Sequence, residues 1–134
     1  MKIVKGYVSS EEINGSFIPQ KLQNLLLRDY CSKNKLNLNL SSTEYENSNL
    51  MLFSLIDEID KLNGIVFFSI FQLPKIKKTR FELFKKIINK KKILHFALES
   101  ITLKKNSDIQ EIEYIYKINF LKNNNVNKKS IKTL

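Results

Sequence analysis

The stretch GIVFFSIFQLP, residues 64–74, decides the fold of this 134-residue chain. Residues 65–71 form a nearly continuous apolar run, which suits a central strand of a parallel sheet because such a strand is covered on both faces. Leu73 and Pro74 close the run. Asn63 and Gly64 precede it, and this pair is typical of a left-handed cap at the end of a helix.

Strand and helix patterns alternate on both sides of this run. Further strands are expected at residues 3–9, 36–40 and 93–98, and helices at residues 19–33, 49–63, 75–91 and 107–121. This order predicts one α/β domain over residues 1–121, flavodoxin-like and built in three layers. Its sheet would be four-stranded and mainly parallel, in the order 2-1-3-4, with helices on both faces and a C-terminal helix. Residues 122–134, rich in Lys and Asn, are expected to form a frayed tail.

The formal charge of +10 raises the question of a nucleic-acid partner. Only Arg28 and Arg80 are arginines among the 23 basic residues, and specific recognition of phosphates and bases favours the planar arginine fork. A solvated lysine surface is therefore favoured, and a nucleic-acid partner ranks last. The single Cys31 indicates a reducing compartment, and no apolar run approaches the ~20 residues of a membrane span, so we expect a cytoplasmic protein.

Polar side chains follow the carboxyl ends of all four predicted strands, at the edge where open parallel sheets bind ligands. They are Ser9 and Ser10, then Glu44, Tyr45 and Glu46, then Gln72, then Glu99 and Ser100. We expect Ser9, Ser10, Tyr45, Gln72 and His95 to bind a ligand there. The alternative is that these positions are polar only because loops are solvated.

Glu44 and Glu99 are the candidate catalytic residues at this edge. Glu44 would act as a general base with Glu99 as its partner, since neighbouring carboxylates divide acid and base roles between them. The alternative is that both are surface acids or contacts to helix dipoles. His95, the only histidine, lies in the last predicted strand, where a hydrogen-bonded position beneath a helix is favoured over a catalytic one.

Several common sites are missing from the sequence. One histidine and one cysteine do not make a zinc site of the usual kinds. The glycine loops of dinucleotide and P-loop sites are also missing, so no metal and no cofactor are expected. Cys31 follows Tyr30 late in a predicted helix and is expected to be a small packed residue rather than a nucleophile.

Short blocks in the first hundred residues carry a family resemblance. They are GYVSS (6–10), PQ (19–20), RDYC (28–31), TEY (43–45), GIVFFSIFQLP (64–74) and HFALE (95–99). In order and spacing they resemble the sporadic carbohydrate cluster proteins, which are encoded among bacterial surface-polysaccharide genes. This resemblance implies a role in making or decorating a cell-surface glycan, and it brings no catalytic residues.

A more distant resemblance is to the catalytic domain of resolvase-type serine recombinases. Tyr7-Val8-Ser9 matches the end of their first strand, which would place Ser9 at the nucleophile. Two departures follow: Tyr7 stands where that family has arginine, and residues 71–75 read FQLPK where it has an arginine-bearing stretch. The resemblance implies a shared fold with lost or replaced chemistry, because a scissile phosphate would lack its guanidinium clamp.

The last predicted helix has more apolar surface than one core-facing stripe requires. Its apolar residues are Ile109, Ile112, Tyr114, Ile115, Tyr116, Ile118, Phe120 and Leu121. We therefore expect a homodimer or larger oligomer that uses this helix, as the recombinase resemblance also implies.

Three functions remain open. The first is an enzyme or enzyme accessory of surface-carbohydrate biosynthesis, acting on a sugar or nucleotide-activated sugar by carboxylate acid/base chemistry. The second is a non-catalytic binding or assembly protein on a resolvase-like fold. The third is a basic nucleic-acid binder. The sequence does not decide whether the protein is an enzyme.

Overall fold

The computed structural model describes residues 2–45 and 48–133, and it describes side chains as far as Asn119. Its sheet has the strand order β2-β1-β3-β4-β5. The strands are β1 (Lys2–Ser9), β2 (Leu36–Glu44), β3 (Gly64–Phe67), β4 (Ile93–Phe96) and β5 (Ile101–Leu103). The first four pair in parallel and β5 joins β4 antiparallel, so the predicted order 2-1-3-4 is confirmed and a fifth strand is added.

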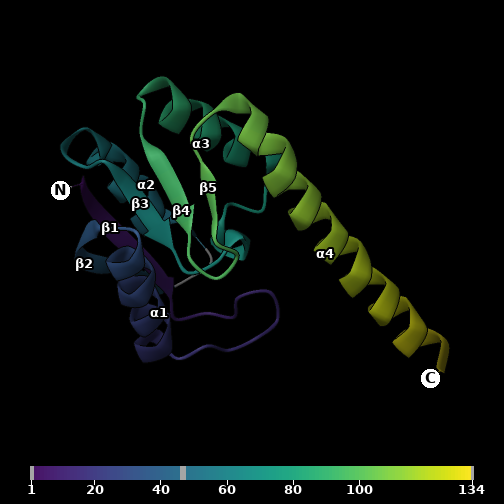
Figure 1. Ribbon diagram of the computed structural model, residues 1–134. Helices are drawn as coiled ribbons and strands as arrows, with labels where there is room; N and C mark the ends of the chain where they lie inside the picture. Colours follow the sequence, from purple (N-terminus) through teal and green to yellow (C-terminus); the bar gives the residue numbers. More distant parts are fainter. Residues whose placement is uncertain (1, 46–47, 134) are drawn as a thin grey trace.

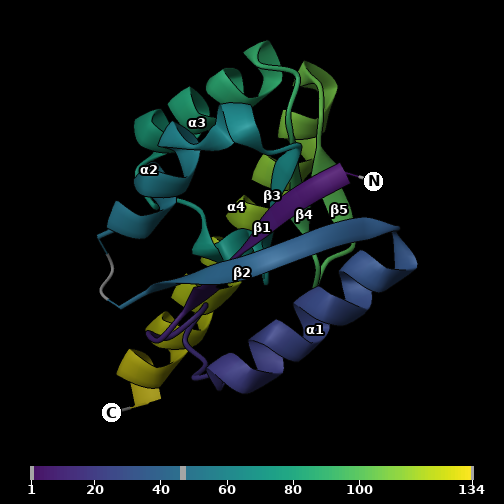
Figure 2. The ribbon, with the colours of Figure 1, turned by 90° about the vertical axis from the view of Figure 1, so that its left-hand side faces the viewer.

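Helices cover both faces of this sheet, as the three-layer prediction requires. They are α1 (Gln20–Lys33), α2 (Leu50–Asp57), α3 (Lys77–Asn89) and α4 (Asn106–Thr133), with short 3-10 turns η1 (Ile59–Lys61) and η2 (Ile70–Gln72). Figure 2 shows α1 on one side of the sheet and α2 and α3 on the other. In Figure 1, α4 starts against the sheet and extends well beyond the body of the domain.

The core is divided by the sheet because successive strand residues point to opposite faces. On the face toward α2 and α3, the rings of Tyr7, Phe67 and Phe96 contact one another across three strands, with centroids 5.0 and 5.2 Å apart. On the opposite face, Val66 and Leu27 belong to a second buried cluster beneath α1. The apolar run of β3 is thus covered on both sides, as predicted for a central strand.

Several strand ends differ from the predicted ones. β3 ends at Phe67 because Ser69 opens η2: its backbone N–H donates to Gln72 Oε1 and its hydroxyl accepts from the Phe71 N–H. β4 ends at Phe96, and the chain then turns into β5 through Ser100, which has a φ of 56°. β2 continues beyond residue 40 to Glu44, which pairs with Ser9.

The left-handed cap predicted at Asn63-Gly64 is wrong. α2 ends at Asp57, and Gly64 is the buried first residue of β3. A Cβ placed on Gly64 would lie 2.1 Å from the carbonyl oxygen of Ile93 in β4. Glycine is therefore required here for the close approach of two strands.

α4 runs from Asn106 to Thr133, past the helix end expected at residue 121. Of its apolar residues, Ile112 is buried, whereas Tyr114 and Ile118 are exposed. Phe120 and Leu121, which were also assigned to the apolar surface, lie outside the described side chains. Among the described residues, no helix combines the length and apolar composition needed to cross a membrane.

The close approach at Gly64 can be tested by substitution. Gly64→Ala should destabilise the protein by about 3 kcal/mol, because backbone atoms of β3 and β4 must separate. Gly15→Ala is a matched control: Gly15 has a φ of +81° but open space around its Cα, so only about 1 kcal/mol of backbone strain is expected. Urea unfolding measures the loss of unfolding free energy in both variants. Equal losses in the two variants would contradict the close approach assigned to Gly64.

Candidate functional site

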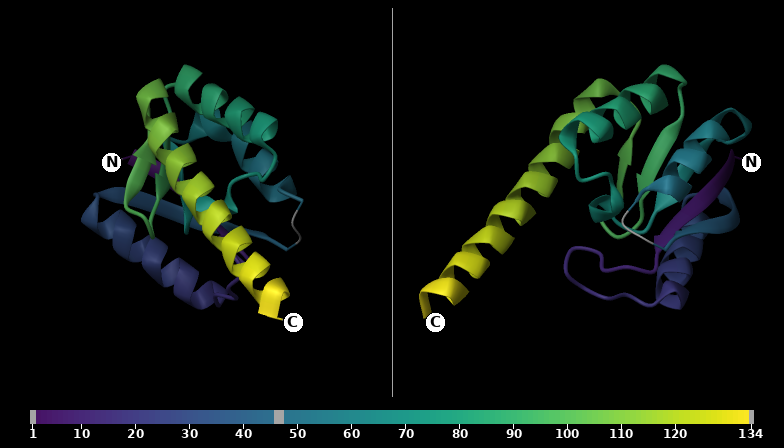
Figure 3. Two further views of the ribbon diagram at one scale, coloured as in Figure 1. Left: turned by 90° about the vertical axis from the view of Figure 1, so that its right-hand side faces the viewer. Right: turned by 180° about the vertical axis from the view of Figure 1, so that it is seen from behind.

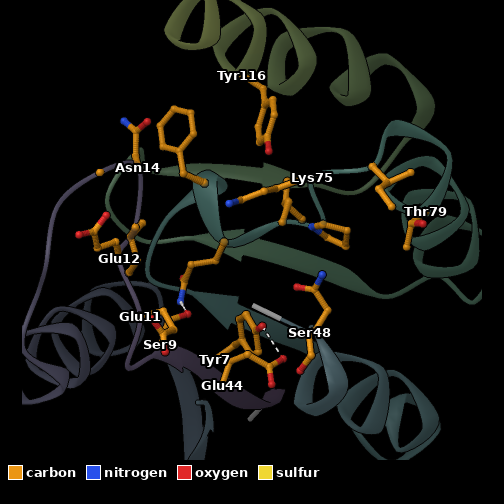
Figure 4. Close-up of a pocket in the computed structure, with 18 of the residues that line it drawn as sticks. Tyr7, Ser9, Glu11, Glu12, Asn14, Glu44, Ser48, Lys75, Thr79 and Tyr116 are labelled. Carbon is orange, nitrogen blue, oxygen red and sulfur yellow. Dashed lines mark hydrogen bonds between the residues drawn. The ribbon is translucent and has the colours of Figure 1, made fainter. Parts of the chain in front are cut away.

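A cavity of about 800 Å³ opens at the carboxyl ends of β1 and β2. We call it the strand-end pocket, and Figure 4 shows it. Its floor comes from the ends of β1 and β2 and from η2. Its walls come from the loop after β1, the start of α2, and the segment leading into α3, while α4 closes one side. The lining residues that carry polar groups are Tyr7, Ser9, Glu11, Glu12, Asn14, Glu44, Ser48, Asn49, Gln72, Lys75, Thr79, Tyr116 and Asn119.

Ser9 is held in the pocket floor by two glutamines. The buried Gln23 of α1 accepts the Ser9 N–H at 2.9 Å and donates to the Ser9 carbonyl at 2.8 Å. Gln72 Nε2 donates to the Ser9 hydroxyl oxygen at 2.9 Å. The Ser9 hydroxyl thus has a fixed position and its own proton left to donate. Ser9 and Gln72, two predicted ligand-binding residues, are brought together here.

Glu44 lies beside them and is 5% exposed, so it is not the solvated loop end that one interpretation expected. Its Oε1 accepts from the Tyr7 hydroxyl at 2.9 Å and from the Met51 N–H at 3.1 Å. The Leu52 N–H also points to it, at 3.4 Å. Glu44 therefore caps the N-terminus of α2, where a negative charge is stabilised by the helix dipole.

Tyr7 is the residue at which the recombinase resemblance implied an arginine. Burial and the neighbouring Glu44 carboxylate raise the pKa of its hydroxyl well above the ordinary range. Tyr7 is therefore a protonated hydrogen-bond donor at neutral pH and supplies no positive charge. The two arginines do not replace it, because neither Arg28 nor Arg80 is among the lining residues that the structure describes.

Arg80 instead holds α4 against the pocket. Its guanidinium forms two bonds with Glu113, at 2.7 and 2.6 Å, and donates to the carbonyls of Pro74 and Lys75. The same group lies 4.4 Å from the ring centroid of Tyr116. One buried cation thus ties α4 to the segment that forms a pocket wall. Asn119 of α4 also donates to Asn14 in the loop after β1.

Other predicted site residues lie elsewhere. Ser10 donates to the carbonyls of Glu44 and Tyr45, and the Tyr45 side chain is exposed. Glu99 caps η2 by accepting from the Ser69 hydroxyl at 2.7 Å and the Ile70 N–H at 3.0 Å. None of these side chains is among the described residues that line the pocket. Glu46, which was grouped with them, lies outside the described residues.

His95 lies on the opposite face of the sheet, beneath α1. Its Nδ1 and the Tyr30 hydroxyl are hydrogen-bonded at 2.8 Å. Burial, with smaller contributions from Lys104 and Lys2, lowers the pKa of His95 to about 4. The structure shows the favoured interpretation, a hydrogen-bonded histidine beneath a helix, and His95 is not among the described residues that line the pocket. Burial also raises the pKa of the neighbouring Cys31 to about 11, which keeps the thiol protonated.

Comparisons with known proteins show the fold. No family profile and no curated protein matches the sequence. The N-terminal catalytic domain of TP901-1 integrase is similar in structure, with a TM-score of 0.66 and 15% identity, over 92% of this chain and 98% of that one. A resolvase family site-specific recombinase from Streptococcus pneumoniae gives a TM-score of 0.67 and 12% identity, over 98% and 95%. The fold is therefore resolvase-like, as predicted.

The sequence missed several residues that line the pocket or hold its walls in place. Arg80 carried a signal, because an arginine is unusual in a chain whose basic residues are nearly all lysine. Its partner Glu113 lies 33 positions away, so the pairing could not be found by local spacing. Asn119 and the residues of the loop after β1 carried no pattern. Within the described part of the chain, no group of three or more potential ligand side chains is arranged to hold a metal ion.

The buried His95 predicts a specific pH dependence of stability. Its pKa is near 6.5 when unfolded and about 4 when folded, so only the unfolded state gains a proton as the pH falls below 6.5. The contribution of His95 to the free energy of unfolding is fully present above pH 6.5. It falls by about 3 kcal/mol as the pH approaches 4. Unfolding free energies at pH 7 and pH 4.5 measure the loss. His95→Gln should remove this component, and an unchanged pH slope in the variant would contradict the assignment.

Proposed function

We propose that this protein binds a sugar in the strand-end pocket and acts in bacterial surface-carbohydrate biosynthesis. The observation that carries the proposal is the convergence of Ser9, Glu44 and Gln72 in one cavity at the carboxyl ends of the strands. A fixed hydroxyl, a carboxylate and amides suit a polyhydroxylated ligand, because sugar hydroxyls both donate and accept hydrogen bonds. The pathway rests on the sequence blocks that resemble the sporadic carbohydrate cluster proteins.

The size and composition of the cavity support a small-molecule ligand. Its volume of about 800 Å³ is within the roughly 300–1,000 Å³ of typical ligand sites. Phe53, Phe71 and Tyr116 add apolar surface to the polar floor. The C–H face of a sugar ring can pack on such surface while its hydroxyls reach the floor.

Any acid/base chemistry in this pocket would depend on Glu44 without Glu99. Glu44 Oε1 accepts from Tyr7 and from the start of α2, whereas among the described residues Oε2 accepts only from the Met51 N–H, at 3.2 Å. Oε2 is thus the atom that would accept a proton from a bound hydroxyl. Binding without turnover requires only that this atom accepts a hydrogen bond, so binding is the firmer part of the proposal.

Neighbouring serines provide the test of the pocket. Ser9→Ala should abolish stabilisation by sugars in a thermal-shift screen, because Ser9 lines the cavity. Ser10→Ala should keep it, because Ser10 is not among the described lining residues and its hydroxyl donates to the backbone carbonyls of Glu44 and Tyr45. The screen would use hexoses, hexosamines, sugar phosphates and nucleotide sugars, and saturation at a hundred times Kd should add about 2.7 kcal/mol of stability. A ligand that stabilises both variants equally would place binding elsewhere.

Assembly through α4 is a second candidate function, and the exposure of its apolar residues favours it. Tyr114 and Ile118, four positions apart on one helical face, are 66% and 45% exposed. The right-hand view in Figure 3 shows α4 extending past the rest of the domain. We infer that a second copy of the chain covers this face.

Light scattering of size-exclusion peaks tests this assembly. The wild type should elute as a dimer or larger species at micromolar concentration, and Tyr114→Ser with Ile118→Ser should give a monomer, because apolar area buried between copies is removed. Lys117→Ser is a control at an exposed charged position between them. A monomeric wild type would end this candidate without affecting the pocket.

A further inference from the structure

We propose that the strand-end pocket selects a sugar that carries hydroxyl or amine groups over one that carries a phosphate or a nucleotide. This inference rests on the proposed function and narrows its ligand class. The sequence left phosphorylated and nucleotide-activated sugars open. The distribution of charge and hydrogen-bonding groups around the cavity distinguishes among them.

The charge of the lining is opposite to that of the chain. The chain has a formal charge of +10, yet its cavity is lined by three carboxylates, Glu11, Glu12 and Glu44, and one ammonium group, Lys75. A phosphate entering the cavity would meet like charge, which weakens binding, whereas a protonated amine would meet opposite charge. The excess of lysine elsewhere on the chain makes this acidic lining a local property of the pocket.

Most hydrogen-bond donors of the floor are already engaged, and the Ser9 hydroxyl keeps one proton to donate. The Tyr7 hydroxyl donates to Glu44, and Gln72 Nε2 donates to Ser9. The N-terminus of α2, which would otherwise attract an anion, is capped by Glu44 through Met51 and Leu52. A phosphate oxygen needs donors, so the floor offers it little.

The acceptors, by contrast, are available to a ligand. Glu11 and Glu12 lie on the loop after β1, and Figure 4 shows both beside the cavity. Glu44 lines the same cavity from the floor. Hydroxyl and ammonium groups are donors that carboxylates bind well, and a charged donor strengthens each bond.

The cationic side of the pocket is small. Lys75 is its single ammonium among the described residues, and Thr79 adds a hydroxyl from the first turn of α3. The next lysine, Lys77, lies over the ring of Phe81, 5.4 Å from its centroid. With one exposed ammonium group and three carboxylates, the cavity favours a ligand that is rich in hydrogen-bond donors.

Calorimetric titration with matched probes tests the selection. The probes are glucosamine, galactosamine and mannosamine, the three parent hexoses, and their 1-phosphates, at low ionic strength and a pH at which the amines are protonated. Within the stereochemical series that binds (gluco, galacto or manno), the hexosamine should bind about fivefold tighter than the parent hexose. The hexose 1-phosphate should bind about fivefold weaker than the hexose. Salt at 0.5 M should reduce both differences, because it screens the carboxylates.

Variants of the acidic loop assign the effect to the pocket. Glu11→Gln with Glu12→Gln should bring the hexosamine-to-hexose ratio close to one while hexose binding persists. Glu82→Gln with Glu111→Gln changes the net charge equally at exposed positions outside the lining and should leave the ratio unchanged. A ratio that falls in both double variants would assign the selection to overall charge and overturn the inference.

The outcomes separate this inference from the proposed function. Tighter binding of the hexose 1-phosphates, lost in Ser9→Ala, would overturn the selection for unphosphorylated sugars and keep the pocket as a sugar site. A second outcome is that none of the nine probes binds while a nucleotide sugar stabilises the wild type and not Ser9→Ala. This would also overturn the selection and keep the pocket as a sugar site. Absence of binding by every sugar would overturn both proposals.

Discussion

The buried carboxylate of Glu44 is the interaction on which the arrangement of the site depends. A carboxylate removed from water must be satisfied by donors, and here the donors come from different elements: the Tyr7 hydroxyl of β1 and the Met51 and Leu52 amides of α2. The carboxylate therefore fixes the end of β2 against β1 and sets where α2 begins. The pocket floor is built around this contact, so its polar groups are positioned before any ligand arrives.

Two further contacts complete the frame around Glu44. Gln23 binds both backbone groups of Ser9, which keeps the end of β1 from fraying where it leaves the sheet. Arg80 joins Glu113 and the ring of Tyr116 to the segment before α3, so α4 closes one side of the cavity at a defined place. The pocket floor and the side closed by α4 thus depend on buried polar groups that are paired within the protein. In a resolvase-like fold whose position 7 is tyrosine, these groups give the strand ends a polar and acidic character rather than a cationic one.

The sequence predicted the parts of the fold that depend on local pattern. The apolar run of residues 65–71 located the central strand, and the alternation of elements gave the strand order. It could not predict that β2 reaches Glu44, because β2 is an edge strand and its last residues, SSTE, have no apolar alternation. It also missed the three-residue β5, which exists because the chain turns back at Ser100 and pairs with β4. Ser9, Glu44 and Gln72 were found because strand ends meet at one edge. Glu99 was expected beside them, yet it lies in the turn between β4 and β5 and caps η2 instead.

The central claim is that a sugar occupies the strand-end pocket, and nuclear magnetic resonance tests it most directly. Titration of a hexosamine into ¹⁵N-labelled protein should shift the amide signals of Ser9, Glu12, Asn49 and Thr79, which line the cavity. The signals of Lys33 in α1 and Thr102 in β5 should stay in place, because neither residue lines the cavity. Shifts confined to α1 and β5, or no shifts at saturating sugar, would contradict the account.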